Sequence, residues 1–534
     1  MREKLPNILL IIADCARSDK WLGDNRTTYT PNLDRLSREG LSFPTTIAEK
    51  CLTTPSFINI LTGLYSPRHG VHQAWGYRLP EDVPLLTSIL GDLEYQRYAE
   101  VTGPLLPELG LDRGFDTYEY RAPNDYLHTA WGDQIIQRLL NGYYKKPWFL
   151  MIHLWELHLP RQKKPKNHRS GQEQNGYEQA ISALDAQLGR IFDALDENTF
   201  IIFTGDHGEK TKAETYREGT AVDYACKRLH IKRAKGRALY EIAFLTGPSV
   251  VHQLYAESVI PMLDTIGIDD VVERFSFSLW TRFKDFWRLF QLLPKRLGKD
   301  LLFINSPLKQ TSILKKNKLL DEDLSRRKIN QFLQSVNRER LHDMQARMFI
   351  NTYRKNLVEG HAIHVYDFLV RVPLVLHWKG RLPAGVVHKG IIKSIDILPT
   401  VFDLIGVHPL LWQNIDGRSY KPFIERKFWK QSAAFVSVTG VPPDFLIHGV
   451  RTEDYKYTYG PKNPELPEEL YDLRNDPGET LNLAKKEREL CTRLRGLTEH
   501  LIPQKNPKKA ERIILEKKRE ALIHKSLRDM GYMD

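Results

Sequence analysis

The chain has 534 residues, of which 41% are hydrophobic, 27% charged and 10% aromatic. This ordinary globular composition excludes wholesale disorder and collagen-like structure. At roughly 150 residues per domain, the length allows about three domain-sized units, or one large α/β domain with a smaller one. Lys and Arg outnumber Asp and Glu by 78 to 66, and the resulting charge of +12 favours anionic partners without choosing among them.

The four cysteines are Cys15, Cys51, Cys226 and Cys491, and their spacing fits neither a disulfide scaffold nor a structural zinc module. The apolar run near the N-terminus ends on Asp14 after about six residues and is too short for the core of a signal peptide. No stretch reaches the roughly 18 apolar residues that a spanning helix needs. We therefore expect a soluble, cytoplasmic protein.

The first 210 residues alternate apolar runs with helical patterns. The runs predict strands at 8–13, 148–154 and 199–204, and the patterns predict helices at 31–40 and 177–195. Such alternation is typical of a mostly parallel sheet between helices, where ligands lie at the carboxyl ends of the strands. Asp14 ends the first predicted strand, and Asp206 and His207 follow a later one.

Basic helical segments dominate 211–350, and a strand pattern resumes at 372–377. We interpret 211–350 as a helical insertion in a catalytic domain that spans 1–430. Part of it, 271–303, repeats apolar residues at helical spacing among basic ones. It could be a lid packed on the catalytic domain, a helix lying on a membrane surface, or a helix that binds a partner. A peripheral membrane contact through 271–303 therefore stays open.

A smaller α+β subdomain is expected at 431–504, with a strand around Tyr455 and a turn at 475–478. The residues from 505 to 534 read as a basic helical tail. We expect no nucleic acid partner, because the basic charge is not accompanied by any known reader module.

Hydroxyl, carboxylate and imidazole groups gather in a few segments. The segment CLTTPS at 51–56 places hydroxyls before an apparent helix start, and TGDHGE at 204–209 follows a buried strand. An alcohol is hardly ionised at neutral pH, so it needs activation, which a divalent metal can supply. Carboxylates with one imidazole suit zinc, manganese, magnesium or calcium. Further histidines could bind ester oxygens or protonate a leaving group.

Taken in order, these segments resemble the sulfatase branch of the alkaline phosphatase superfamily. The matching pieces are AD at 13–14, TPNLDRL at 30–36, LTG at 61–63, SPRHG at 66–70, ELH at 156–158, GDHGE at 205–209, RVP at 371–373, DILPT at 396–400, DGRS at 416–419, ELYDL at 469–473 and DPGE at 476–479. The resemblance covers about 1–210 and 358–490. It implies an alkaline-phosphatase-like α/β fold and an ester hydrolase that acts on an anionic ester substrate.

The family's nucleophile motif reads C-x-P-S-R. Aligning it on Pro55 and Ser56 puts Thr53 at the nucleophile position and Phe57 at the place of the motif Arg, while Cys51 lies two residues too early. The resemblance therefore implies a Thr nucleophile in place of formylglycine. Relatives with a Thr nucleophile cleave or transfer phosphate diesters.

The resemblance also implies the metal ligands Asp14, Thr53, Asp206 and His207, which would hold one divalent ion, Mn, Zn, Mg or Ca. Cys15 stands where typical sulfatases have a second Asp, which puts their calcium site in doubt.

Two histidines, His158 and His361, match residues that would contact the ester oxygens or the leaving group, and are the further catalytic candidates. His364 lies near enough in sequence to His361 to exchange roles with it, and Arg17 is a candidate for substrate binding. The stretch VTGPLL at 101–106 lacks the Lys and His with which sulfatases bind sulfate.

The sequence thus predicts a metal-dependent, sulfatase-like hydrolase of phosphate esters, diesters above all, or of sulfate esters. Two alternatives remain. One is a transferase that moves a phosphoalcohol head group to a lipid- or glycan-linked acceptor, and the other is a non-enzymatic binding protein.

Overall fold

The computed structural model describes residues 5–24, 26–74, 77–158, 176–211, 364–425, 433–439, 446–462, 468–502 and 510–512. Apart from Thr211, these residues belong to one compact unit that spans 1–210, 360–440 and 446–530. Nearly all of the predicted insertion, the amphipathic segment 271–303 and His361 lie outside the described residues. Within the described ranges, no helix is both long enough and apolar enough to span a bilayer.

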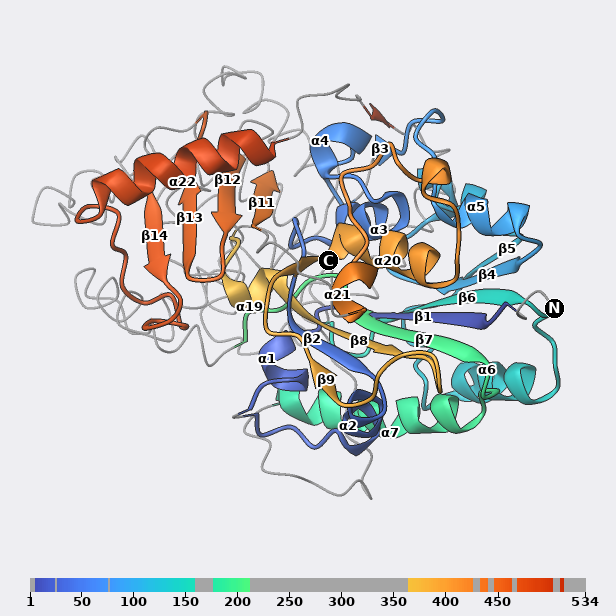
Figure 1. Cartoon of the computed structure of the whole chain (residues 1–534). Coiled ribbons are helices and arrows are strands. Elements are labelled where there is room, and N and C mark those ends of the chain that lie inside the picture. The colour runs from blue at the N-terminus through green and yellow to red at the C-terminus, as the bar shows by residue number, and fades with distance from the viewer. Residues whose placement is uncertain are drawn as a thin grey trace, which may run out of the picture. The chain divides into compact units, whose positions relative to one another are not determined.

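A nine-stranded sheet carries the unit, in the order β10-β2-β8-β7-β1-β6-β4-β5 with β9 beside β2. Every described pair is parallel except those of β8, which runs antiparallel to β2 and β7 (Figure 1). The strands are β1 Asn7–Ala13, β2 Leu41–Ile47, β4 Gln96–Val101, β5 Thr117–Tyr120, β6 Trp148–Leu154, β7 Thr199–Gly205, β8 Arg371–His377, β9 Val386–Val387 and β10 Ile392–Lys393. The mostly parallel sheet and the predicted strands are confirmed.

Side chains of β1 alternate between two cores because successive residues of a strand point to opposite faces of the sheet. Ile8, Leu10 and Ile12 join the core that includes side chains of α3, α5 and α20. Leu9 and Ile11 join the core that includes side chains of α2, α6 and α7. These helices are α2 Pro31–Arg38, α3 Thr53–Thr62, α5 Thr87–Asp92, α6 Ala130–Leu140, α7 Gly176–Asp193 and α20 Ile397–Leu404. The continuous apolar run of β1 reflects burial on both faces.

Shorter helical segments connect these elements. They are α1 Ser18–Trp21, α4 Ser66–His69, η1 Pro107–Leu109, η2 Asp112–Gly114, α19 Asp367–Val370, η4 Ser394–Asp396, η5 Pro409–Leu411 and α21 Lys421–Ile424.

The central strand β1 should dominate the stability of the unit. Ile11 is 0% exposed, so Ile11→Ala leaves a cavity, and we expect the free energy of unfolding to fall by about 2–5 kcal/mol. Urea denaturation followed by circular dichroism measures the change. Leu410→Ala is the control, because Leu410 is 64% exposed and its loss should change stability by less than about 0.5 kcal/mol.

A second sheet is antiparallel, in the order β11-β12-β13-β14, and α22 lies along it (Figure 1). Its elements are β11 Ala434–Thr439, β12 Leu446–Arg451, β13 Tyr455–Tyr459, β14 Glu469–Asp472 and α22 Arg488–Leu501. Val450, Tyr457 and Leu494 share one core between this sheet and the helix. The strand expected around Tyr455 is present.

The tail differs from its prediction at one place. Glu511 and Arg512 form the short strand β15 (Glu511–Arg512), which pairs antiparallel with β3 (Tyr77–Arg78), where the sequence predicted helix. Backbone pairing with a strand distant in sequence overrides the local helical preference here. Residues 505–509 and 513–534 lie outside the described residues.

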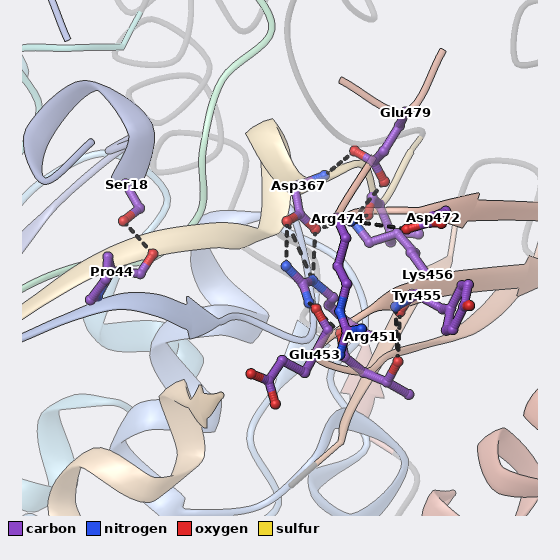
Figure 2. A network of polar contacts seen from close by, with 12 residues as sticks. Ser18, Pro44, Asp367, Arg451, Glu453, Tyr455, Lys456, Asp472, Arg474 and Glu479 are labelled. Carbon is purple, nitrogen blue, oxygen red and sulfur yellow. Dashed lines mark hydrogen bonds and ion pairs between the residues drawn. The ribbon is translucent and has the colours of Figure 1, made fainter. Parts of the chain in front are cut away.

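Four buried charges join α19 to the second sheet (Figure 2). Arg451 of β12 donates to the Asp367 carboxylate at 3.0 Å, and Lys456 of β13 contacts the same carboxylate at 2.5 Å. Glu479 lies 3.0 Å from the Lys456 ammonium and accepts from the Asp367 backbone N–H at 2.6 Å. Lys456 also donates to the carbonyl of Val365 at 2.7 Å. The network therefore fixes the backbone that immediately follows His364.

Candidate active site

The chemical groups of the site meet at one edge of the large sheet. Asp14 follows β1, Asp206 and His207 follow β7, and His153 is the penultimate residue of β6. These three strands are parallel neighbours, so their carboxyl ends lie together. Thr53 begins α3, which follows β2 along the chain.

The Thr53 hydroxyl points into this group. Its Oγ1 donates to Asp14 Oδ2 at 3.0 Å and lies 3.4 Å from His207 Nε2. Thr53 is the first residue of α3, where backbone N–H groups have no partner within the helix. A negatively charged ester oxygen beside Thr53 would therefore find hydrogen-bond donors and a favourable helix dipole.

The neighbouring candidates in the same segment have other partners. The Cys51 thiol donates to the carbonyl of His364 at 3.0 Å. The hydroxyl of Thr54 donates to the carbonyl of Ala74, and that of Ser56 donates to the carbonyl of Lys50. Among the hydroxyls of 51–56, the structure directs that of Thr53 at a carboxylate.

Two fully buried carboxylates face the same space. Asp206 Oδ1 accepts the backbone N–H groups of Cys15 and His207 at 3.2 and 2.7 Å. Asp206 Oδ2 and Asp14 Oδ1 have no hydrogen-bond partner among the described residues, although both residues are 0% exposed. Buried carboxylate oxygens without donors are costly, so they mark a place where a cation fits.

The pKa values of the two carboxyl groups differ, because two negative charges in one buried site repel each other. Burial opposes the charge on Asp14, but the nearby imidazoles of His153 and His207 hold its pKa well below the ordinary value. Burial, together with the charge of Asp14, raises the pKa of Asp206 well above its ordinary value. A cation between them would allow both to ionise.

The donor atoms are close enough to hold a metal ion. One atom each from Asp14, His153 and Asp206 lie within 4.8 Å of one another, as do atoms from Asp14, Cys15 and His207. The Cys15 thiol is a poor donor here, because burial and the charge of Asp14 raise its pKa well above the ordinary value. The residues present therefore fit a divalent metal, with Asp14 and Asp206 at the centre.

His153 is a site residue that the sequence analysis missed. It interrupts an otherwise apolar strand, one residue before its end, and this is the signal that could have found it. Its ring lies edge-on to Phe57, with centroids 4.8 Å apart, and edge-on to Trp155 at 5.4 Å.

The remaining predicted residues have different surroundings. His158 stacks on the Trp155 ring at 4.1 Å, and its imidazole is one of the groups that lower the pKa of Asp14. His364 is buried and stacks on Tyr366 at 4.9 Å, and burial holds its pKa well below the ordinary value. Their roles toward substrate stay predictions, as does that of His361.

Arg17 is engaged within the protein. Its guanidinium donates to both carboxylate oxygens of Asp19, at 3.0 and 2.8 Å, and to the carbonyl of Glu209 at 3.3 Å. These contacts use at least three of its five guanidinium N–H donors, and its role toward substrate stays a prediction.

Two family models match the chain. The model described as Sulfatase matches residues 6–246, and the model described as N-sulphoglucosamine sulphohydrolase, C-terminal, matches residues 362–506. An N-acetylglucosamine-6-O-sulfatase of Bacteroides thetaiotaomicron is 22% identical over 529 residues, which cover 91% of this chain and 85% of the relative. The multifunctional alkaline phosphatase superfamily protein PehA of Trinickia caryophylli is 22% identical over 520 residues, covering 90% and 91%.

Solved structures share the fold. The phosphonate monoester hydrolase of Agrobacterium radiobacter is similar with a TM-score of 0.53 and 16% identity, covering 93% of this chain and 95% of that one. A structure determined with its substrate D-glucosamine-2-N,6-O-disulfate has a TM-score of 0.55 and 15% identity, covering 95% and 100%. At these identities the likeness concerns the fold.

Proposed function

Because this chain belongs to the sulfatase family of the alkaline phosphatase superfamily, we propose that it is a metal-dependent hydrolase of phosphate esters, with diesters preferred, that forms a covalent intermediate on Thr53. The family makes it a sulfatase-like ester hydrolase. The observation that supports the finer proposal is the buried hydrogen bond from Thr53 Oγ1 to Asp14, beside carboxylate oxygens that have no donor among the described residues.

The residues would divide the reaction as follows. A divalent cation held by Asp14, Asp206 and His207 would supply the positive charge that lowers the pKa of the Thr53 hydroxyl and neutralises an ester oxygen. Asp14 orients Thr53 Oγ1 for in-line attack on phosphorus. The start of α3 offers N–H donors to the oxygens on which charge develops.

Attack by Thr53, after loss of its hydroxyl proton to solvent, would expel one alcohol of the diester and leave the remaining phosphate monoester bound to the threonine. His158 and His361 are the candidates to protonate the departing oxygen. A water molecule would then attack the phosphorus and release Thr53. This order splits one difficult displacement into two easier ones.

Three departures from the sulfatase pattern favour phosphate over sulfate. Phe57 replaces the motif Arg, and Cys15 replaces the second Asp. The stretch from Val101 to Leu106 lacks the sulfate-binding Lys and His, and its apolar side chains Val101, Leu105 and Leu106 belong to the core instead. The Arg, Lys and His that would bind a sulfate group are therefore missing, and Cys15 lacks the carboxylate of the usual calcium site.

Sulfate monoester hydrolysis is the second candidate, because the N-acetylglucosamine-6-O-sulfatase aligns along 91% of this chain. The same hydroxyl and carboxylates could serve a sulfate ester. The anionic ester substrate is common to both candidates. Peripheral membrane contact was predicted for 271–303, which also gave head-group transfer some support, and this segment lies outside the described residues.

The test uses the full chain, stripped of metal and refilled in turn with Zn²⁺, Mn²⁺, Mg²⁺ or Ca²⁺. Hydrolysis of bis-p-nitrophenyl phosphate, p-nitrophenyl phosphate and p-nitrophenyl sulfate is then compared. We expect no turnover without metal, and a higher kcat/KM for the diester than for either monoester once metal returns. Preference for the sulfate would favour the second candidate, and full activity after stripping would overturn metal dependence.

A further inference from the structure

The nitrogen of His153 that faces the site has no hydrogen-bond partner among the described residues. His153 Nε2 lies 3.6 Å from Asp14 Oδ2, beyond hydrogen-bond distance, and both residues are 0% exposed. Asp14 Oδ1 and Asp206 Oδ2 are likewise without donors in the described part of the chain. Three buried acceptors thus converge on one place, which requires a positive charge among them.

The opposite nitrogen decides which form of the imidazole is present. His153 Nδ1 lies 3.1 Å from the carbonyl oxygen of Thr102, and His207 Nδ1 lies 2.8 Å from that of Gly208. A carbonyl only accepts, so each Nδ1 carries the proton and each Nε2 presents its lone pair to the site. A backbone carbonyl behind the far nitrogen is the usual support of a histidine that binds a metal.

From this geometry we propose that His153 is a further ligand of the divalent ion and that the site selects Zn²⁺ over Ca²⁺. The proposal rests on the metal site of the proposed function. The donor set becomes two imidazole nitrogens and two carboxylates, with the Thr53 hydroxyl beside them. Zinc favours such mixed nitrogen and oxygen donors, whereas calcium takes six to eight oxygens.

Two departures from the sulfatase pattern lie in contact with His153. Phe57, at the place of the motif Arg, packs its ring against the imidazole. Thr102, in the stretch that lacks the sulfate-binding Lys and His, supplies the carbonyl that holds Nδ1. A charged arginine at 57 would repel a cation at this place. The neutral ring instead holds the imidazole in its orientation.

The test measures metal binding in the absence of substrate, so that its result is independent of catalysis. Metal-free full chain is titrated with Zn²⁺ and with Ca²⁺ by isothermal calorimetry, and cobalt(II) absorption reports the ligands. In His153→Asn, the shorter amide can keep the hydrogen bond to Thr102 but removes Nε2. His408→Ala is the control, since His408 lies at η5, apart from the site.

We expect the wild type to bind Zn²⁺ more tightly than Ca²⁺. His153→Asn should lose at least the ~10–100-fold in Zn²⁺ affinity that an outer-shell change costs, with a changed cobalt spectrum, while His408→Ala stays unchanged. Equal melting temperatures of the metal-free proteins would show that the fold is intact. Unchanged zinc affinity in His153→Asn would mean that a proton occupies this place instead, and a wild-type preference for calcium would overturn the selectivity. If zinc binds as expected but no ester is cleaved, the proposed function fails and this inference stands.

Discussion

Alanine in place of Thr53 is expected to lower kcat/KM for bis-p-nitrophenyl phosphate by about 10⁴-fold or more, because it removes the proposed nucleophile. The hydroxyl is buried and donates to Asp14, whereas the neighbouring hydroxyls of Thr54 and Ser56 donate to backbone carbonyls. Steady-state kinetics on the metal-loaded enzyme measure the loss. Calorimetric titration in parallel shows whether the variant still binds metal.

Two variants of the same segment make this result specific. Thr53→Ser keeps a hydroxyl and should retain most of the activity. Cys51→Ala removes a thiol that donates to the carbonyl of His364, and we expect only a small change in kcat/KM. If Cys51→Ala abolished activity and Thr53→Ala did not, the alignment of the nucleophile motif would be wrong and Cys51 would be the catalytic residue.

Replacing Lys456 by Met should lower the free energy of unfolding by about 3–5 kcal/mol, because it leaves buried carboxylates short of a cation. The side chain of Lys456 is 1% exposed and contacts both Asp367 and Glu479 (Figure 2). Arg451 still pairs with Asp367 in this variant. The Glu479 carboxylate therefore loses more of its charge compensation than the Asp367 carboxylate does. Urea denaturation at fixed pH gives the change, and Lys486→Met on the exposed surface is the matched control.

The size of this loss should depend on pH. Burial raises the pKa of Glu479 to about 7, although Lys456 opposes the shift. Without Lys456 the pKa of Glu479 rises further. The carboxyl is then neutral at pH 6 at little added cost, whereas at pH 8 keeping it protonated or ionising it without Lys456 costs more free energy of folding. The destabilisation should accordingly be larger at pH 8 than at pH 6. Glu479→Gln in the Lys456→Met background should restore part of the stability, and an additive double mutant would show that the two residues do not interact.

Much of the fold follows from local patterns. The strands at 148–154 and 199–204 and the helix at 31–40 are present within two residues of their predicted bounds, because apolar runs and helical spacing act locally. The positions of Asp14, Asp206 and His207 after strands were equally visible, since the residue after a parallel strand lies at the ligand-binding edge. Family motifs in one order added the expectation that these residues form one site.

Contacts between segments that are far apart in the chain could not be predicted from the sequence. A parallel strand buried on both faces is a continuous apolar run whichever strand lies beside it, so its neighbours cannot be read from its pattern. The order β7-β1-β6 was needed to bring His153 to Asp14 and Asp206. The same holds for the contact of the Arg17 guanidinium with the carbonyl of Glu209, 192 positions along the chain.

The sequence by itself indicated the family and the α/β class and showed which polar residues follow the strands. It also predicted the register that places a threonine at the nucleophile position. Only the tertiary structure decided which hydroxyl meets a carboxylate, which histidine faces the two aspartates, and how buried charges tie α19 to the second sheet. The physical reason is the difference in sequence separation between local patterns and the contacts that form the site. Hydrophobic periodicity and motif spacing act over a few residues, whereas the site joins Asp14 to His207, 193 positions along the chain. The distance between such residues depends on strand order and packing.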